Sequence, residues 1–336
     1  MDKDEKSFFE EEVYNKSLEY FNGDELATST FVNKYALKNK EGKYLEKTPD
    51  DMHNRLAKEF YRIENKYKNP KKEKDFKHSL DHFKYIIPGG SVMYGVGNPY
   101  VNVSLSNCIA LSSPSDSISG IFDKSKDMAN LFKARCGIGL PLDNLRPDGS
   151  RVNNSAGSST GAWSFANYYS EVCRMIGQFG RRGALILTMN VKHPDIEKFV
   201  TMKRDLTKVT GANVSVMITD EFMNAVKNDE EWKLQWPIDV PIDDAKYTKT
   251  IMAKDLWFLI NESATKSGEP GLIFIDNYKK NLPADYYPEF KSVCVNPCCF
   301  SQEHDVFIIT KNGYKEIKEI NSQDKIWING EYVETT

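Results

Sequence analysis

Two cysteines have neighbours that suit redox chemistry. Cys108 follows the alternating segment VNVSLS as part of Asn107-Cys108, and Cys298 follows FKSVCV as part of Asn296-Pro297-Cys298. Both segments predict strands, so each thiol is expected at the carboxyl end of a strand, where α/β sheets gather their ligands. No histidine is close in sequence to act as a base, which favours redox or radical chemistry over hydrolysis. Two buried structural cysteines are the alternative interpretation.

The other cysteines, Cys136, Cys173, Cys294 and Cys299, form no CxxC pair and join no histidine at zinc-ligand spacing. We therefore predict no metal site. Cys173 shares a helical stripe with apolar side chains, which predicts a place in the core.

Two glycine-rich loops carry arginines that could bind an anion. GRRGAL occupies residues 180–185, and LRPDGSRVNNSAGSSTG occupies residues 145–161. Guanidinium groups on a flexible backbone can meet phosphate, although an ordinary loop explains GRRGAL equally well. Walker and GxGxxG sequences are absent, which excludes the common phosphate-binding loops for mononucleotides and dinucleotides.

The elements that must position these residues fall into three stretches. Residues 10–84 carry apolar positions three or four apart, which predicts amphipathic helices, and Thr48-Pro49 predicts a helix start. From residue 86, short apolar runs alternate with helical patterns, which indicates crossover units and a mainly parallel sheet.

After Cys299 the pattern changes again. Asn312-Gly313 and Asn329-Gly330 lie between strand-forming residues, so this stretch predicts hairpins. The predicted domains are 1–85, 86–298 and 299–336.

Composition narrows the class of protein. The chain has 336 residues, is 40% hydrophobic and carries 45 basic against 48 acidic side chains, a net charge of -3. No apolar run approaches the length of a membrane span, and the start MDKDEKSFFEEE lacks the regions of a signal peptide. We predict a cytoplasmic protein that contacts neither a membrane nor nucleic acid directly.

The motifs together resemble one family, the catalytic (alpha) subunit of ribonucleotide reductase. The resemblance covers residues 25–298, in the family's order. It rests on PGGSVMYGVG, LSNC, CGIGLPLDNLRPDG, GRRGALILTMNVKHPDIEKFVTMK, TGANVSVMITDEFMNAV, EPGLIFIDN and VNPC. It implies the first half of a ten-stranded α/β barrel after a helical region, and it looks most like the adenosylcobalamin-dependent class. A version with a separate diiron or dimanganese radical subunit is the alternative.

Carried over residue by residue, the resemblance makes Cys298 the thiyl radical that takes the ribose 3′-hydrogen. Asn296 would hydrogen-bond the sugar. Cys108 would be a reductant thiol whose disulfide partner lies outside this chain.

The remaining implied sites bind nucleotides. Ser91, Asn107 and Gly137 match positions that bind substrate phosphate and ribose; some relatives have serine where Asn107 stands. Asp116, Arg146 and Arg182 match positions that serve a dNTP or ATP effector. The implied partners are a ribonucleotide, the effector, a thioredoxin- or glutaredoxin-type reductant and, as one option, a second copy of the chain.

The tail resembles a different family. CFSQEHDVFIITKNGYKEIKEINSQDKIWINGEYVE is similar to the start of an intein, a Hint-type β fold, with Cys299 as the residue that attacks the preceding carbonyl. An ordinary β appendage is the alternative. The expected function is therefore the N-terminal part of a ribonucleotide reductase, inactive until a complementary C-terminal chain is joined by splicing. The alternative is a splicing precursor or nucleotide-binding fragment without reductase activity.

Overall fold

The computed structural model describes residues 7–176, 183–287 and 292–297, together with the backbone of four short strands between residues 307 and 334. The chain divides into two compact units, residues 1–297 and 298–336. Among the described residues, no helix is long and apolar enough to cross a membrane.

The first part of the larger unit is helical. Its elements are α1 (Glu10–Tyr20), α2 (Glu25–Lys34), α3 (Pro49–Glu64), α4 (Glu73–Leu80), the 3-10 turn η1 (Asp81–Phe83) and α5 (Gly90–Gly95). The predicted start of α3 is confirmed: Thr48 is the N-cap, Pro49 is the first helical residue, and the Asp51 carboxylate accepts from the Thr48 N–H at 3.3 Å. Buried side chains from α1, α2, α3 and α5, including Val13, Phe31 and Met52, form one core.

A buried arginine fixes α5 to this core. Arg55 of α3 pairs with Glu46 at 2.7 Å, with both side chains almost fully buried. It also donates to the carbonyls of Met93, at 3.0 Å, and Val96, which lie in and just after α5. The guanidinium therefore satisfies carbonyls at the end of a helix too short to be stable alone.

The rest of this unit alternates strands and helices. They are β1 (Cys108–Ala110), α6 (Ile118–Lys133), β2 (Gly137–Pro141), α7 (Ala162–Met175), β3 (Leu185–Asn190), α8 (Ile196–Thr201), η2 (Met202–Arg204), β4 (Asn213–Ile218), α9 (Asp220–Asn228), β5 (Glu231–Trp236), η3 (Ile242–Asp244), β6 (Tyr247–Met252), α10 (Ala253–Ser267), β7 (Gly271–Phe274), α11 (Ile275–Asn281) and η4 (Pro283–Tyr286). Strands β1-β2-β3-β4-β7 form a parallel sheet in that order. The predicted crossover architecture is confirmed. Strands β5 and β6 form a separate antiparallel hairpin.

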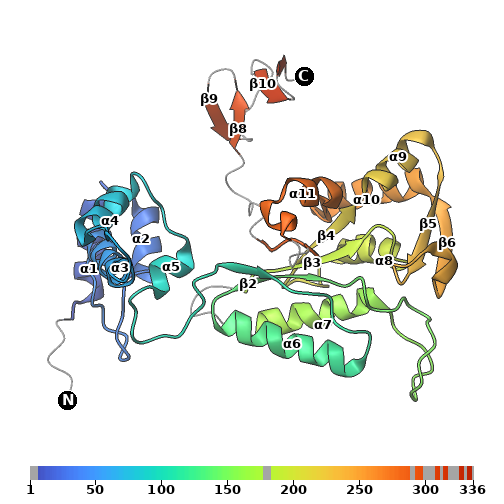
Figure 1. The fold of residues 1–336 in the computed structure, drawn as a ribbon, viewed down its shortest axis with the longest axis horizontal. Coiled ribbons are helices and arrows are strands. Elements are labelled where there is room, and N and C mark those ends of the chain that lie inside the picture. Colours follow the sequence, from blue (N-terminus) through green and yellow to red (C-terminus); the bar gives the residue numbers. More distant parts are fainter. Residues whose placement is uncertain are drawn as a thin grey trace. The chain divides into compact units, whose positions relative to one another are not determined.

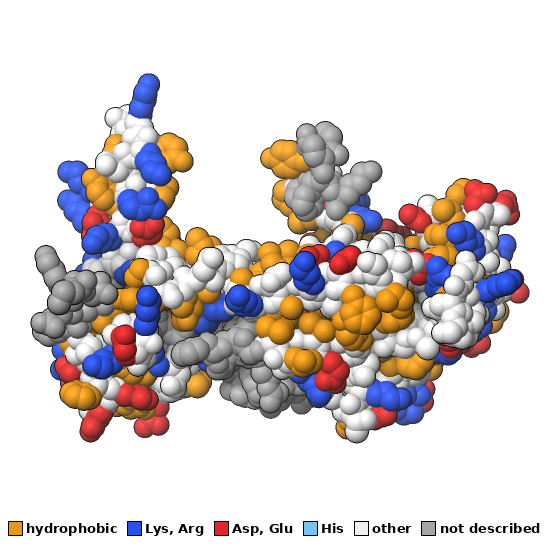
Figure 2. All heavy atoms as spheres, turned by 90° about the horizontal axis from the view of Figure 1, so that it is seen from below, with side chains coloured by type: hydrophobic (Ala, Val, Ile, Leu, Met, Phe, Trp, Pro, Cys, Tyr) orange, Lys and Arg blue, Asp and Glu red, His pale blue; other side chains and the backbone are white. Residues whose placement is uncertain are grey.

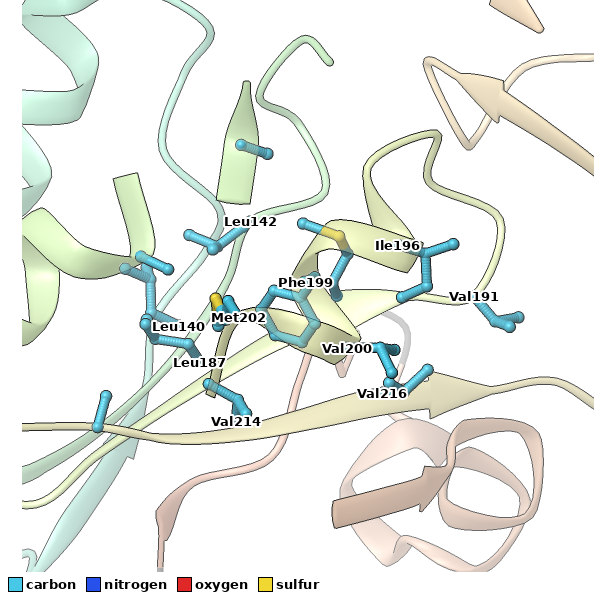
Figure 3. Close-up of a cluster of buried hydrophobic side chains, with 14 of the residues drawn as sticks. Leu140, Leu142, Leu187, Val191, Ile196, Phe199, Val200, Met202, Val214 and Val216 are labelled. Atoms are coloured by element: carbon cyan, nitrogen blue, oxygen red, sulfur yellow. The ribbon is translucent and has the colours of Figure 1, made fainter. Parts of the chain in front are cut away.

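The two faces of β2 differ sharply in side-chain size. Ile138 and Leu140 belong to the main core, with alternate residues of β3 and β4. Helices α6 and α7 lie side by side along the sheet (Figure 1), and apolar side chains of α8 such as Phe199 and Val200 lie over β3 and β4 (Figure 3). The alternate positions of β2 are Gly137, Gly139 and, at its end, Pro141, so the first two positions on the opposite face carry no side chains.

The helix layer also exposes apolar surface. Figure 2 looks onto the side where α6 and α7 lie, and hydrophobic side chains gather over the middle of it. Ile118 and Phe122 of α6 and Met175 of α7 are each more than half exposed.

The smaller unit contains two hairpins, as the Asn-Gly pairs predict. Strands β8 (Phe307–Thr310) and β9 (Gly313–Glu316) pair antiparallel, as do β10 (Lys325–Ile328) and β11 (Glu331–Glu334). All four join one sheet in the order β11-β10-β8-β9.

Two predicted strands are wrong. Residues 101–107 form no strand, so Cys108 begins β1 instead of following a strand. The neighbouring backbone there is the end of α6, where Arg135 has φ 65°, and only separate bonds form, such as Ser104 N–H to the Ala134 carbonyl at 2.9 Å. Residues 292–296 are not a strand either, for a reason that the site makes clear.

Candidate functional site

Cys108 and the segment that precedes Cys298 meet on the glycine face of β2. Cys108 is directly opposite Gly137 in the parallel ladder. A Cβ placed on Gly137 would lie 2.9 Å from the Cys108 Sγ and 3.3 Å from Cγ of Pro297. The sulfur and the proline ring therefore lie against the same glycine, although their residues are far apart in the sequence.

Gly139 shows how the 295–297 segment crosses the sheet. A Cβ on this glycine would lie 1.8 Å from the Val295 carbonyl oxygen and 3.0 Å from the Asn296 Cα. Because a Cβ points out of the sheet, the segment must lie flat against the face of β2 and not along an edge. This explains why residues 292–295, the described part of FKSVCV, do not pair as a strand, and it brings Asn296 to the same face as Cys108.

Ser91 and Asn107 join this cluster from the helical side. The Ser91 backbone N–H donates to Oδ1 of Asn107 at 2.8 Å, and the Asn107 carbonyl accepts from Gly137 N–H at 2.7 Å. Asn107 thus connects α5 to β2. The Ser91 Oγ is fully buried and has no hydrogen-bond partner in the described structure, so it is a polar group available to a ligand.

The structure brings together five of the predicted residues: Ser91, Asn107, Cys108, Gly137 and Asn296. Predictions for Arg182, Cys298 and Cys299 fall outside the described residues. Within the described ranges, no group of three or more His, Cys, Asp or Glu side chains could hold a metal ion.

The described cysteines fall into two chemical states. Cys108 is disulfide-bonded, whereas Cys136, Cys173 and Cys294 are buried thiols outside any disulfide. The expectation that the partner of Cys108 lies outside this chain is therefore wrong for this structure. Burial raises the pKa of Cys173 to about 11, so this thiol stays protonated and unreactive, as its place in the core predicts.

The predicted effector residues Asp116 and Arg146 form a second cluster after β1 and β2. Arg146 Nη2 lies 2.7 Å from Asp116 Oδ2, and the Arg146 backbone N–H donates to Oδ1 at 3.0 Å. The hydrogen bond to Asp116 raises the pKa of Arg146. Both side chains are about a quarter exposed, at 31% and 23%, so a ligand can reach the pair.

Sequence reasoning missed Gly89, the residue ahead of α5. A Cβ there would lie 2.3 Å from Nδ2 of Asn107, so this position must be glycine for Asn107 to reach Ser91. The consecutive glycines of PGGS carried the signal, but only the tertiary contact shows which side chain they admit.

Known protein families match the chain over both its helical part and its sheet. Residues 106–303 match the family described as ribonucleotide reductase, barrel domain, and residues 21–100 match ribonucleotide reductase, all-alpha domain. The chain belongs to the ribonucleotide reductase family. The two matches correspond to the large subunit of these enzymes. The barrel match covers the parallel sheet, and the all-alpha match covers the helical part.

Several relatives are similar over more than half of the chain. A vitamin B12-dependent ribonucleoside-diphosphate reductase from Thermoplasma acidophilum is 34% identical over 196 residues, 58% of this chain and 24% of the relative. Another, from Mycobacterium tuberculosis, is 32% identical over 185 residues, which are 54% of this chain and 26% of the relative. The ribonucleoside-diphosphate reductase large chain 2 of Saccharomyces cerevisiae is 28% identical over 244 residues, which are 66% of this chain and 28% of the relative. The chain thus spans about a quarter of the length of these relatives.

Replacing Gly139 by alanine is expected to displace the 295–297 segment, because the new methyl group would meet a backbone carbonyl that cannot rotate away. Any reductase activity that depends on this segment should fall about a hundredfold, the scale of a misplacement near 1 Å. Ile138→Val is the control: it removes one methylene from the opposite face, should cost about 1 kcal/mol and should leave activity intact. Equal activity of the two variants would contradict the geometry.

A buried carboxyl after β2 predicts a pH dependence of stability. Burial raises the pKa of Asp143 to about 7, although the Asn190 N–H donates to its Oδ1 at 2.7 Å. The folded carboxyl therefore holds its proton while the unfolded one loses it, and stability falls as pH rises from about 4 to 7. At about 1.4 kcal/mol per pKa unit, the free energy of unfolding falls by at most about 4 kcal/mol.

Asp143→Asn should remove this dependence, because the amide oxygen can accept the same hydrogen bond without a charge. Melting temperatures at pH 5 and pH 8 test the prediction. The original protein should lose more stability than the variant between these values; parallel losses would show that Asp143 does not titrate in this way.

Proposed function

We propose that this chain is the N-terminal part of a ribonucleotide reductase catalytic subunit, which reduces ribonucleotides to deoxyribonucleotides by thiyl-radical chemistry. The observation that carries the proposal is the meeting of Cys108 and the Val295–Pro297 segment on the glycine face of β2. The next residue in the chain is Cys298, the proposed radical. The names of the relatives favour ribonucleoside diphosphates as substrates.

The proposed roles follow from what each residue can supply. The Cys298 thiyl takes the ribose 3′-hydrogen, and Asn296 hydrogen-bonds the sugar. Cys108 and a second thiol supply two electrons and two protons, so that the 2′-hydroxyl leaves as water, a hydrogen replaces it and the two sulfurs form a disulfide. A sulfur radical must be shielded from water and held at contact distance, and a segment packed on bare backbone meets both needs.

Substrate binding is assigned to the polar groups beside this face. The buried Ser91 Oγ would donate to a phosphate oxygen, while Asn107 holds α5 in place through its side chain. Gly137 is assigned to the ribose site, where the absence of a side chain lets the Cys108 sulfur and the Pro297 ring lie against the strand. Because the chain has a net charge of only -3, its anion sites must be local, as these are.

Effector binding is assigned to Asp116, Arg146 and Arg182. The guanidinium of Arg146 suits a triphosphate and the carboxylate of Asp116 suits a ribose hydroxyl, and their partial exposure leaves both accessible. The ligand would be a dNTP or ATP. Residues 179–186, which include Arg182, would pass the identity of the effector to the substrate site.

The radical source is proposed to be adenosylcobalamin, since two of the relatives are vitamin B12-dependent by name. When bound, this cofactor would supply the radical that oxidises Cys298. A separate diiron or dimanganese subunit is the alternative, because the yeast large chain carries no B12 designation.

The proposed partners complete the enzyme. A C-terminal chain would supply the remaining barrel, and a thioredoxin- or glutaredoxin-type protein would reduce the disulfide after each turnover. A second copy would cover the exposed apolar side chains of α6 and α7. We assign residues 299–336 to the start of an intein, with Cys299 as its first nucleophile.

Removing the proposed radical thiol tests the reductase function. In the complete reductase, assayed with adenosylcobalamin, Cys298→Ala should abolish product formation and leave nucleotide binding unchanged. Cys108→Ser should stop reduction of the 2′ carbon. Cys173→Ala is the matched control, because this thiol lies on α7 in the main core under the sheet. This variant should keep most of the activity. Full activity of Cys298→Ala would refute the proposal.

Splicing is tested by mixing the chain with its candidate C-terminal partner and measuring the mass of any ligated product. Cys299→Ala should prevent ligation, because no thiol remains to attack the preceding carbonyl, whereas Cys298→Ala should ligate normally. If the unaltered chain yields no ligated product, residues 299–336 are an ordinary β appendage.

A further inference from the structure

His193 and Asp195 are buried titratable residues that the proposed chemistry does not use. They belong to the HPD sequence between β3 and α8, where His193 is fully buried and Asp195 is 4% exposed. Val191 before them and Ile196 after them are fully buried in the main core (Figure 3), so the backbone of this turn is fixed on both sides.

Both side chains form hydrogen bonds to the arginine-bearing loop 145–161. The His193 Nε2–H donates to the Leu145 carbonyl at 2.8 Å, and its Nδ1 accepts from the Asp195 N–H at 3.0 Å. Burial lowers the pKa of His193, which keeps the ring in the neutral form that these two bonds require.

The Asp195 carboxylate reaches both ends of the same loop. It accepts from the Asp148 N–H at 3.0 Å and from the Ala162 N–H at 2.8 Å. Together with the His193 bond, this anchors the chain immediately before Arg146, two residues after it, and again at the start of α7.

A glycine confirms that the contact is sterically demanding. Gly161 has φ +86°, and a Cβ there would lie 2.4 Å from Asp195 Oδ2 and 2.8 Å from the Asp148 backbone nitrogen. Only glycine allows the carboxylate to approach both loop ends at once.

Arg146 depends on this anchoring for its own geometry. Its guanidinium pairs with Asp116 and donates through Nη1 to the Arg151 carbonyl at 2.9 Å, a residue of the same loop. If the loop ends were released, Arg146 would lose the backbone positions from which it forms these bonds.

We propose that His193 and Asp195 are positioning residues of the effector site: they clamp both ends of loop 145–161 and thereby set the affinity of Arg146 for a nucleoside triphosphate. This inference rests on the proposed effector function of Arg146. The clamp directly follows the carboxyl end of β3.

The test uses the complete reductase with Asp195→Ala and Asp195→Asn. Alanine removes every acceptor, so half-saturation by dATP or dTTP should require about tenfold more nucleotide or more, the usual consequence of orphaned buried N–H groups. Asparagine keeps one oxygen and should produce a smaller shift. The substrate KM and the kcat at saturating effector should stay unchanged, which a general loss of folding would not allow.

The matched control is Asp205→Ala, whose carboxylate bonds only to Thr207 and Lys208 on an exposed turn. It should bind effector as the unaltered enzyme does. Hydrogen exchange gives an independent readout: the amides of Asp148 and Ala162 should lose protection in Asp195→Ala, while α6 keeps its own.

The outcomes separate the two proposals. If the unaltered reductase binds neither dATP nor dTTP, the effector function itself is wrong. If it binds them and both Asp195 variants bind equally well, or if the Asp148 and Ala162 amides stay protected in Asp195→Ala, the clamp is refuted. The clamp is supported if Asp195→Ala binds dATP or dTTP more weakly than the unaltered reductase and its Asp148 and Ala162 amides lose protection.

Discussion

The close approach of the Val295 carbonyl to Gly139 is the constraint on which the rest of the structure depends. A chain that crosses the face of a sheet at this distance needs positions without side chains beneath it, and β2 provides two, Gly137 and Gly139. Gly137 also admits the Cys108 sulfur. The glycines therefore decide both where the 295–297 segment lies and which side chain lies next to it.

Because β2 has glycines on one face, the packing that holds this strand in place must come from the side chains on its other face. Gly137 and Gly139 contribute no burial of their own, so β2 is held by Ile138 and Leu140 under α6 and α7. Large-to-small changes in such a core cost several kcal/mol, which makes the layer a rigid support. Rigidity matters here because radical transfer between a sulfur and a carbon-bound hydrogen tolerates little displacement.

The same sheet carries two separated polar clusters. Ser91, Asn107 and Cys108 gather where β1 and β2 begin, whereas Asp116 and Arg146 follow the ends of those strands. Strand β3 lies beside β2 in register and ends ahead of His193, which holds the Arg146 loop. Because the strands share one core, a change at either cluster acts on elements that pack together.

Sequence patterns alone were sufficient for the elements with strong local signals. The 3.6-residue periodicity predicted the helices, the Thr48 cap predicted the start of α3, and the Asn-Gly pairs predicted both hairpins of the tail. The alternation of strands and helices predicted a parallel sheet, and the motif order predicted the family. These features depend on contacts between residues close in the chain, which a linear sequence records.

Tertiary structure decided what depends on distant neighbours. VNVSLS and the described residues 292–295 of FKSVCV have strand-like alternation, yet neither stretch is a strand. A strand needs a partner with a regular backbone, whereas these stretches lie against the end of α6 and the face of β2. The meeting of Pro297 with Cys108, and of Asp195 with the amides of Asp148 and Ala162, joins residues separated by tens to hundreds of positions. Such contacts form only when the whole sheet has folded, since hydrogen bonds and steric fit act through space and not along the chain.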